Sequence, residues 1–311
     1  MSGRATTERA RSRPNRQDML DPALLTALAD LEMVARVTVD GTVSGLHRSP
    51  FHGYSAEFSQ YRHYRPGDDL KYVDWKLFAR TDRIYTKQYR ETTNMQAQVV
   101  VDASASMAFR GRGPVSKLDY ARLIAAALSY LIALQGDAIG LVTYGSSLRD
   151  YLPSRPGRLH LRRVLIALSK LQSSGATSSA APLGRAIDLL KRRGVLILLS
   201  DLYDDGEDVA SELRRAVRIG HEVAVFQVLT PDELQFPFGK DVELEDLETG
   251  QRMLTNGSTA SSYRASFGEF LERWRTRCAS QGIDYTCVTV SEPLDRVLRS
   301  YLLKRSGSPS R

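Results

Sequence analysis

Cysteine and long apolar runs are both scarce in this sequence of 311 residues. Its two cysteines, Cys278 and Cys287, provide neither a disulfide framework nor the spacing of a zinc finger. The longest mostly apolar run, Leu123 to Leu134, is well short of the roughly 20 residues that cross a bilayer. Five arginines stand within the first 16 residues with no apolar stretch after them, unlike a secretory signal. We therefore expect a cytoplasmic protein without a membrane span.

Several motifs of catalysis and nucleic-acid binding are also missing. The five histidines form no His-Glu-x-x-His pattern and no Gly-x-Ser-x-Gly elbow occurs, so neither zinc nor nucleophilic serine catalysis is indicated. Residues 111–117 superficially resemble a phosphate loop, but the spacing and the preceding strand are absent, and we interpret them as a flexible loop. The net charge of +7 comes from basic residues spread along the chain and concentrated at both tails, so we expect no nucleic-acid partner.

Composition divides the chain into four parts. Residues 1–17 and 305–311 are rich in Arg, Ser, Pro and Gly and are expected to be disordered tails. Residues 18–94 form an N-terminal segment, and residues 95–304 form the main domain. Within the main domain, an acidic stretch at about 240–256 has the pattern of an exposed hairpin insert.

From residue 95 onward, short β-branched runs alternate with longer helical patterns. The run at 195–199 has no polar alternation, which is typical of a strand buried on both faces. A turn at 143–148 predicts that the strand after it is antiparallel and lies at the sheet edge. The fold class predicted is α/β, with a doubly wound, mostly parallel six-stranded sheet of the Rossmann type and one antiparallel edge strand, preceded by an N-terminal helix and collar segment. The expected strands are 99–101, 139–143, 148–152, 195–199, 223–229 and 285–290, and the expected helices are 18–39 (ended by Gly41), 117–134, 160–170, 182–192, 207–219, 260–281 and 293–304.

Side chains that carry oxygen follow two of these strands. Asp102, Ser104 and Ser106 come directly after strand 99–101, and Asp201 follows strand 195–199. In open α/β sheets, ligands bind at the carboxyl ends of the strands. Thr177, in the loop before the helix that leads to Asp201, can supply a third hydroxyl, although Ser178 or Ser179 could take its place.

Such an oxygen set suits a hard divalent cation, Mg²⁺ or another such as Mn²⁺ or Ca²⁺. We therefore predict a metal site whose ligands are Asp102, Ser104, Ser106, Thr177 and Asp201. The alternative is that these residues are only helix caps and turn formers, because Ser and Asp are common after strands in that role.

In residue type and chain order, this set resembles the metal-ion-dependent adhesion site of von Willebrand factor A domains. The resemblance covers about 95–304 and implies a sheet order similar to 3-2-1-4-5-6. The strands that end at Asp102 and Asp201 would then be neighbours. This chain departs from the family pattern at Ala176, where a second glycine is usual, and at Leu202, where glycine often follows the last aspartate.

A second resemblance, to the DUF58 family, covers residues 53–91. The residues that carry it are Gly53, Glu57, Phe58, Arg62, Tyr64, Gly67, Asp68, Asp69, Asp74, Trp75, Ala79, Arg80 and Glu91. Typical members have Arg-x-Ile-Asp-Trp where this chain has Lys-Tyr-Val-Asp-Trp at 71–75. The arginines and acidic residues of this segment predict a paired polar network, and we expect a structural collar fixed to the first strand of the sheet. The resemblance also implies work beside a MoxR-type AAA+ ATPase as a chaperone-like or assembly factor.

Two functions are therefore open. The first is a metal-dependent protein-interaction module, whose partner supplies an Asp or Glu to the metal. The second is a metal-dependent phosphohydrolase with Asp102 as nucleophile. The second has less support, because haloacid dehalogenase-like loops have an Asp where this chain has Ser104 and no general acid follows. No complete catalytic constellation is present, so we do not expect an enzyme.

Overall fold

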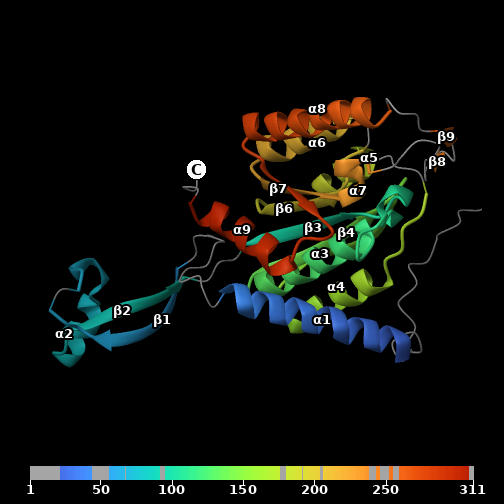
Figure 1. Ribbon diagram of the computed structural model, residues 1–311. Coiled ribbons are helices and arrows are strands. Elements are labelled where there is room, and N and C mark those ends of the chain that lie inside the picture. Colours follow the sequence, from blue (N-terminus) through green and yellow to red (C-terminus); the bar gives the residue numbers. More distant parts are fainter. Residues whose placement is uncertain are drawn as a thin grey trace, which may run out of the picture.

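The computed structural model describes residues 22–43, 56–66, 68–91, 95–175, 180–190, 192–203, 206–237, 243–245, 252–254 and 259–307. Within these ranges, a six-stranded sheet lies between two layers of helices, and a separate pair of strands extends away from it (Figure 1). None of the helices in these ranges has the length and apolar character needed to cross a membrane.

The six-stranded sheet has the order β10-β7-β6-β3-β4-β5. All neighbouring strands are parallel except β4 and β5, so β5 is the antiparallel edge strand that was predicted. Numbered along the chain, this is the order 3-2-1-4-5-6, and the doubly wound fold class is confirmed. The strands are β3 (Gln96–Asp102), β4 (Ala138–Tyr144), β5 (Leu148–Arg155), β6 (Val195–Ser200), β7 (Glu222–Leu229) and β10 (Asp284–Thr289).

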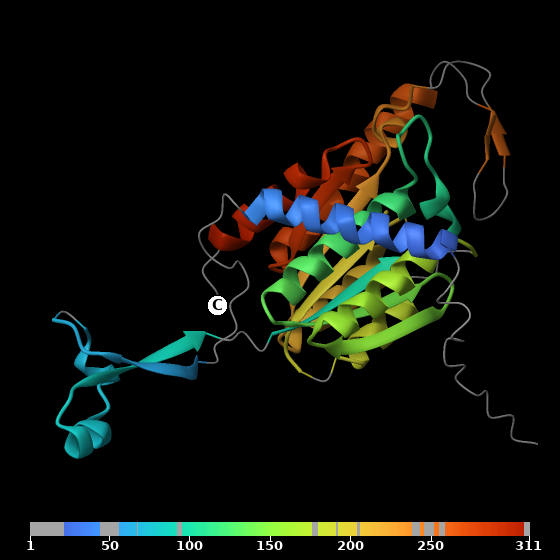
Figure 2. The same cartoon turned by 90° about the horizontal axis from the view of Figure 1, so that it is seen from below.

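Burial on both faces explains why the central strands contain so few polar residues. Every residue of β6 is buried, and the alternating residues of β3 divide between two cores: Val99 and Val101 pack in one, Val100 in the other. The first core lies under α1 (Pro22–Val43), α3 (Lys117–Leu134), α4 (Arg158–Lys170) and α9 (Leu294–Gly307). The second lies under α5 (Ala180–Asp188), α6 (Gly206–Arg218) and α8 (Thr259–Ser280), and α1 forms an outer rod across α3 and α4 (Figure 2).

The helix boundaries differ from the expected ones where burial outweighs local signals. α1 continues through Gly41 to Val43, so the prediction that Gly41 ends it was wrong. Val39 and Thr42 are buried, and the Thr42 hydroxyl donates to the Thr38 carbonyl at 2.7 Å, which is enough to offset the roughly 1 kcal/mol cost of a helical glycine. α5 ends at Asp188, short of the expected 192, and α9 extends to Gly307 into the expected tail. The expected helix start at 18–21 and the tail at 1–17 lie outside the described residues.

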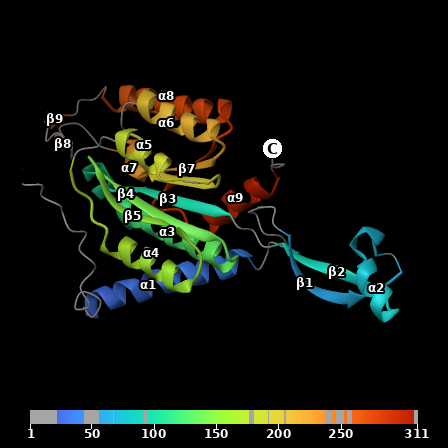
Figure 3. The same cartoon turned by 180° about the vertical axis from the view of Figure 1, so that it is seen from behind.

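The segment that carries the DUF58 resemblance forms a small unit of its own, here called the β1–β2 module. It consists of the antiparallel strands β1 (Ala56–His63) and β2 (Tyr85–Glu91), the short helix η2 (Leu70–Tyr72) and α2 (Trp75–Thr81). We had expected a collar against the first sheet strand, but the module extends away from the sheet in all three views (Figures 1, 2 and 3). At the opposite end of the molecule, β8 (Glu243–Glu245) and β9 (Arg252–Leu254) pair antiparallel within the acidic insert.

The expected polar network of the β1–β2 module is present with partly different members. Arg62 pairs with Asp68 at 2.7 Å, as the pattern suggested. Lysines take the other places, because Lys71 pairs with Asp69 at 3.0 Å and Lys87 pairs with Asp74 at 3.1 Å. The side chains of Arg90 and Glu91 lie outside the described residues.

Candidate metal centre

The loops after β3 and β6 meet at the carboxyl edge of the sheet. β3 and β6 are parallel neighbours in register, with Val101 opposite Leu199, so Asp102 and Ser200 leave the sheet side by side. The two strands lead to helices on opposite faces, which makes this the point where the winding of the sheet reverses. The expectation that the strands leading to Asp102 and Asp201 are neighbours is thus confirmed.

Asp102 is completely buried. Its Oδ1 accepts the Ser104 backbone N–H at 2.9 Å, and its Oδ2 accepts the Ser200 hydroxyl at 2.7 Å. Burial, and then repulsion from Asp201, raises the pKa of Asp102 to about 6 in spite of these hydrogen bonds. A carboxylate in this environment would be stabilised by a nearby cation.

Ser104 and Ser106 bring their hydroxyls together. The two Oγ atoms are 3.1 Å apart, and Ser104 is fully buried. Ser104 stands at the N-cap position of the short helix η3 (Ala105–Ala108), yet its side chain makes no capping hydrogen bond. The alternative, in which Ser104 is only a helix cap, therefore does not account for its hydroxyl. That hydroxyl remains a candidate metal ligand.

Thr177 lies outside the described residues, and so do Ser178 and Ser179. The loop that leads to them is nevertheless attached to the loop after β3: the Ala105 N–H donates to the Gly175 carbonyl at 2.9 Å, and the Ser174 N–H donates to the Ala103 carbonyl at 3.0 Å. Arg149 also donates to the Gln172 carbonyl at 2.6 Å and to Ser174. These contacts bring the chain to within two residues of Thr177 beside the other predicted ligands.

Asp201 is fully buried and has a partner that sequence analysis did not indicate. Its Oδ2 accepts the Lys117 ammonium at 2.7 Å, and the same ammonium donates to Glu233 Oε1 at 2.6 Å. Its Oδ1 accepts the Tyr203 backbone N–H at 3.3 Å. Burial acts to lower the pKa of Lys117, but the two carboxylates outweigh it and the pKa is raised, so the ammonium stays charged.

Glu233 belongs to α7 (Pro231–Gln235), a short helix at the carboxyl end of β7. Thr230 and Glu233 form a capping box, in which the Thr230 hydroxyl accepts the Glu233 N–H while Glu233 Oε2 accepts the Thr230 N–H at 2.6 Å. The next acidic residue, Asp232, accepts Arg112 Nε at 2.8 Å and so ties α7 to the loop at 109–116. Gly111 in that loop has φ +53°, a backbone conformation that glycine adopts without strain, and an added Cβ would meet the Asp232 carboxylate.

Leu202 follows Asp201 with a left-handed backbone, φ 61°. This conformation is unfavourable for a bulky residue and is adopted most readily by glycine. Here the Leu202 side chain is buried in the second core, which offsets the strain. The turn holds Tyr203 with its ring centroid 4.6 Å from the Lys117 Nζ.

The residues at this edge fit a hard cation in two respects. The donors are oxygens only, from carboxylates and hydroxyls that converge on one loop cluster. Asp201 and Glu233 share the Lys117 ammonium, and Asp102 adds a third carboxylate near Asp201, so negative groups are in excess among these described residues. Within the described residues, no group of three or more His, Cys, Asp or Glu could hold a metal by itself. The predicted ligand set is not a group of that type, because most of its members are serine and threonine hydroxyls.

Sequence analysis missed Ser200, Lys117 and Glu233. One signal was available for Glu233: Thr230 and Glu233 have the spacing of a capping box directly after a strand that ends at the same sheet edge. Lys117 carries no such signal, since it lies 84 positions from Asp201 and 116 from Glu233. The Lys117 side chain is 1% exposed, and it is the first residue of α3.

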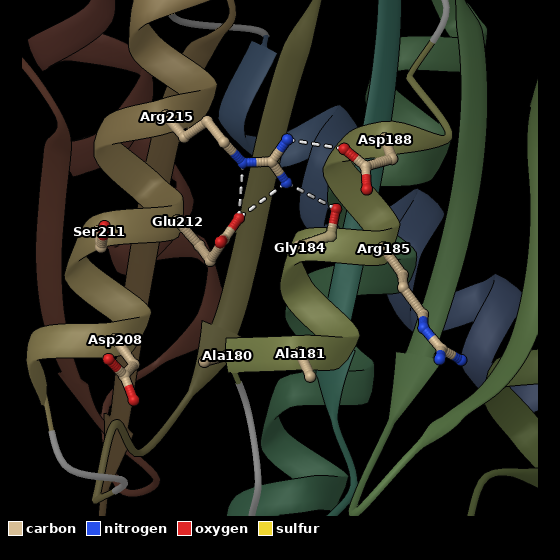
Figure 4. A pocket seen from close by; sticks show the side chains of 9 residues that line it. All are labelled: Ala180, Ala181, Gly184, Arg185, Asp188, Asp208, Ser211, Glu212 and Arg215. Atoms are coloured by element: carbon tan, nitrogen blue, oxygen red, sulfur yellow. Dashed lines mark hydrogen bonds and ion pairs between the residues drawn. The ribbon is translucent and has the colours of Figure 1, made fainter.

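A pocket of about 340 Å³ lies between α5 and α6 (Figure 4). Arg215 spans it, donating to Asp188 at 2.6 Å, to Glu212 at 2.8 Å and to the Gly184 carbonyl at 2.9 Å. These partners satisfy the guanidinium within the protein itself. None of the predicted metal ligands lines this pocket.

Comparison with known proteins gives matches along most of the chain. The family model described as "Protein of unknown function DUF58" matches residues 60–277. Uncharacterized proteins of Mycobacterium tuberculosis and Mycobacterium bovis are each 32% identical to it over 239 residues, or 76% of this chain and 74% of theirs. Among solved structures, the conserved hypothetical protein BatB of Bacteroides thetaiotaomicron is 18% identical with a TM-score of 0.46, covering 69% of this chain and 100% of that one. An aerotolerance-related membrane protein of Bacteroides fragilis is 16% identical with a TM-score of 0.45, covering 68% and 99%.

Proposed function

This chain belongs to the DUF58 family, and we propose that it is a metal-dependent protein-interaction module rather than an enzyme. The observation that carries the proposal is the cluster of buried oxygens at the sheet edge, where negative groups outnumber the single ammonium among them. In this proposal a divalent cation, Mg²⁺ or another such as Mn²⁺ or Ca²⁺, is held in the manner of von Willebrand factor A domains. Its ligands are Asp102, Ser104, Ser106, Thr177 and Asp201.

Three of these residues, Asp102, Ser104 and Ser106, come from one loop and supply different kinds of ligand. Asp102 supplies a buried carboxylate whose pKa is raised by burial and by repulsion from Asp201. Ser104 and Ser106 supply hydroxyls that are already adjacent. Neutral hydroxyls are weaker ligands than carboxylates, so the bound ion would offer a coordination position to a carboxylate from another molecule. That position is the proposed recognition surface.

The partner we propose is a protein that presents an Asp or Glu to this position, and specifically a MoxR-type AAA+ ATPase. This choice rests on the family resemblance, which also implies a chaperone-like or assembly role. We place the interaction in the cytoplasm, where a reducing environment suits the free thiols of Cys278 and Cys287. The interacting unit is taken as residues 95–304.

A binding experiment with a purified MoxR-type ATPase tests this function. The protein should bind in Mg²⁺ and dissociate in chelator at constant ionic strength, because a coordination bond needs the ion whereas surface ion pairs are weakened mainly by salt. Ser104→Ala/Ser106→Ala protein should fail to bind. Ser211→Ala, an exposed serine on α6, is the matched control and should bind normally.

Binding that survives both the chelator and the double substitution, but is lost in high salt, would show that recognition does not use the metal site. A direct measurement separates the metal from the partner: calorimetry should show Mg²⁺ binding to the wild-type protein and none to Asp102→Ala. The Asp102→Ala protein should keep a folded far-ultraviolet spectrum.

A further inference from the structure

Lys117 is buried more completely than a lysine normally is, and it lies beside the proposed metal site. Its side chain is 1% exposed, and its ammonium reaches Asp201 at 2.7 Å and Glu233 at 2.6 Å. The rings of Tyr203 and Phe109 lie 4.6 and 5.9 Å from the nitrogen. Lysines are almost never fully buried unless they are paired, so this placement requires an explanation.

The local structure around Lys117 does not favour a cation. It is the first residue of α3, directly after the N-cap Ser116, whose hydroxyl accepts the Asp119 N–H at 3.1 Å. The positive end of a helix dipole disfavours an ammonium at that position. The carboxylates of Asp201 and Glu233 must therefore stabilise the ammonium. They follow the carboxyl ends of β6 and β7.

The charges of the cluster do not cancel. Among the described residues, the hydrogen bonds and ion pairs of Asp201 and Glu233 involve no cation other than Lys117. Arg112, on the preceding loop, pairs with Asp232 instead. With Asp102 ionised as well, the cluster holds three carboxylates and one ammonium, which leaves an excess equal to the charge of one divalent ion.

We propose that Lys117 is a positioning residue of the metal site: it holds Asp201 in place and cancels one carboxylate charge, so that the site matches a divalent cation. This inference rests on the proposed function and adds to it a determinant of ion selectivity. Because Lys117 engages Oδ2 of Asp201, Oδ1, which accepts the Tyr203 backbone N–H at 3.3 Å, is the oxygen that would hold an ion. Without the ammonium, the cluster would carry one more negative charge and would favour a trivalent ion.

The measurement that tests this is the ratio of Tb³⁺ to Mg²⁺ affinity, obtained from Tb³⁺ luminescence and its displacement by Mg²⁺. Lys117→Met removes the charge at similar side-chain volume, and should raise this ratio by about tenfold or more, since a nearby unit charge in a protein interior acts strongly on an ion. Glu233→Gln removes one negative charge and should lower the ratio. Gln retains the capping-box geometry of α7.

The double variant Lys117→Met/Glu233→Gln has the same excess charge as the wild-type protein. Its ratio should return towards the wild-type value, and it should be more stable than Lys117→Met because one unpaired buried carboxylate is gone. A purely structural role for Lys117 would change the melting temperature in these variants but not the ion ratio. If Lys117→Met does not fold, the ratios of Tb³⁺ to Mg²⁺ affinity of Glu233→Gln and of the double variant still test the role of Lys117. Asp102→Asn checks that the ions occupy this site.

The outcomes separate this inference from the proposed function. If the wild type binds Mg²⁺ and the ratio of Tb³⁺ to Mg²⁺ affinity is unchanged in all three variants, the role of Lys117 is overturned, whereas the proposed metal site is not. If the wild type binds no Mg²⁺ but Lys117→Met binds a cation, both the proposed function and the positioning role are overturned, because the Lys117 ammonium then takes the place of the ion. No cation binding by any of these proteins overturns both.

Discussion

The six-stranded sheet and the helices packed on it, here called the α/β body, contain an aspartate paired with a lysine, and so does the β1–β2 module. The surroundings of the two pairs are very different. In the body, the side chains of Asp201 and Lys117 are 0% and 1% exposed, at 2.7 Å. In the module, those of Asp74 and Lys87 are 10% and 35% exposed, at 3.1 Å. The chemical groups are the same, but only the first pair is removed from water.

Two aspartates reveal the consequence of this difference. Burial and the neighbouring Asp201 raise the pKa of Asp102 to about 6. The pKa of Asp74 is lowered to about 2, first by the backbone N–H of Leu77 and then by Tyr61 and Lys87. A carboxylate that has hydrogen-bond donors and access to water is stable as an anion, whereas a buried one with a like charge nearby needs a cation. The surroundings in the module therefore favour the ionised form of Asp74, whereas those in the body disfavour the ionised form of Asp102.

The largest effect should come from breaking the buried pair. Asp201→Ala leaves the Lys117 ammonium buried with one carboxylate fewer, and should cost about 3–5 kcal/mol in the free energy of unfolding. Denaturant unfolding in chelator measures this without a contribution from bound metal. Asp69→Ala, which removes the partner of the exposed Lys71, is the control and should leave unfolding unchanged within error. Equal effects from the two substitutions would contradict the contrast drawn here.

Acidification should weaken metal binding through the titration of Asp102. Because its pKa is raised, the folded protein binds this proton more tightly than the unfolded chain does, so metal-free protein loses stability as pH rises from about 4 to about 6. The metal requires the ionised form, and Mg²⁺ affinity should fall about tenfold for each pH unit below that pKa. Calorimetry between pH 5 and pH 7 in matched buffers tests this prediction, which would be wrong if affinity were constant over that range.

In the module, the charge of Asp74 should act in the opposite direction. Its lowered pKa means that the ionised carboxylate stabilises the fold above pH 4 and that this stability is lost as pH falls towards about 2. Asp74→Ala removes the N-cap of α2, whose Lys76 and Leu77 N–H groups both bond Oδ1 at 3.0 Å. It should lower the melting temperature by a few degrees without changing Mg²⁺ affinity.

Asp74→Asn keeps a capping oxygen but loses the charge opposite Lys87, so it should fall between the wild type and Asp74→Ala. If Asp74→Ala left the melting temperature unchanged and abolished partner binding, the module would be a contact surface and not a structural unit.

The smallest effects concern one left-handed residue in each region, Leu202 in the body and Asp82 in the module, with φ 61° and 54°. Leu202→Gly should be more stable than Leu202→Ala by about 1 kcal/mol, because both lose the buried side chain but only glycine relieves the strain. Asp82 is an exposed C-cap, so Asp82→Gly should stabilise by up to about 1 kcal/mol. Chemical unfolding of the four proteins provides the comparison. If Leu202→Ala protein were as stable as Leu202→Gly protein, the backbone at this position would not be strained.

Much of the fold could be predicted because its signals are local. The apolar run of β6 and the alternation of strands and helices were sufficient for the doubly wound sheet, and the turn before Leu148 for its antiparallel edge. The strands of the β1–β2 module were not predicted, since Tyr, Arg and Gln alternate in them without an apolar face. α1 runs past Gly41 because side chains on either side of that glycine are buried.

By itself, the sequence determined which oxygens lie on one loop: Asp102, Ser104 and Ser106 are close whatever the rest of the chain does, because only one residue separates each from the next. Tertiary structure alone decided their environment. Lys117, Asp201 and Glu233 come from three elements far apart in the chain, and only folding brings them within hydrogen-bonding distance. The pKa of Asp102 depends on burial and on that assembly, so the charge that distinguishes this edge as a candidate cation site is a property of the fold and cannot be read from a local pattern.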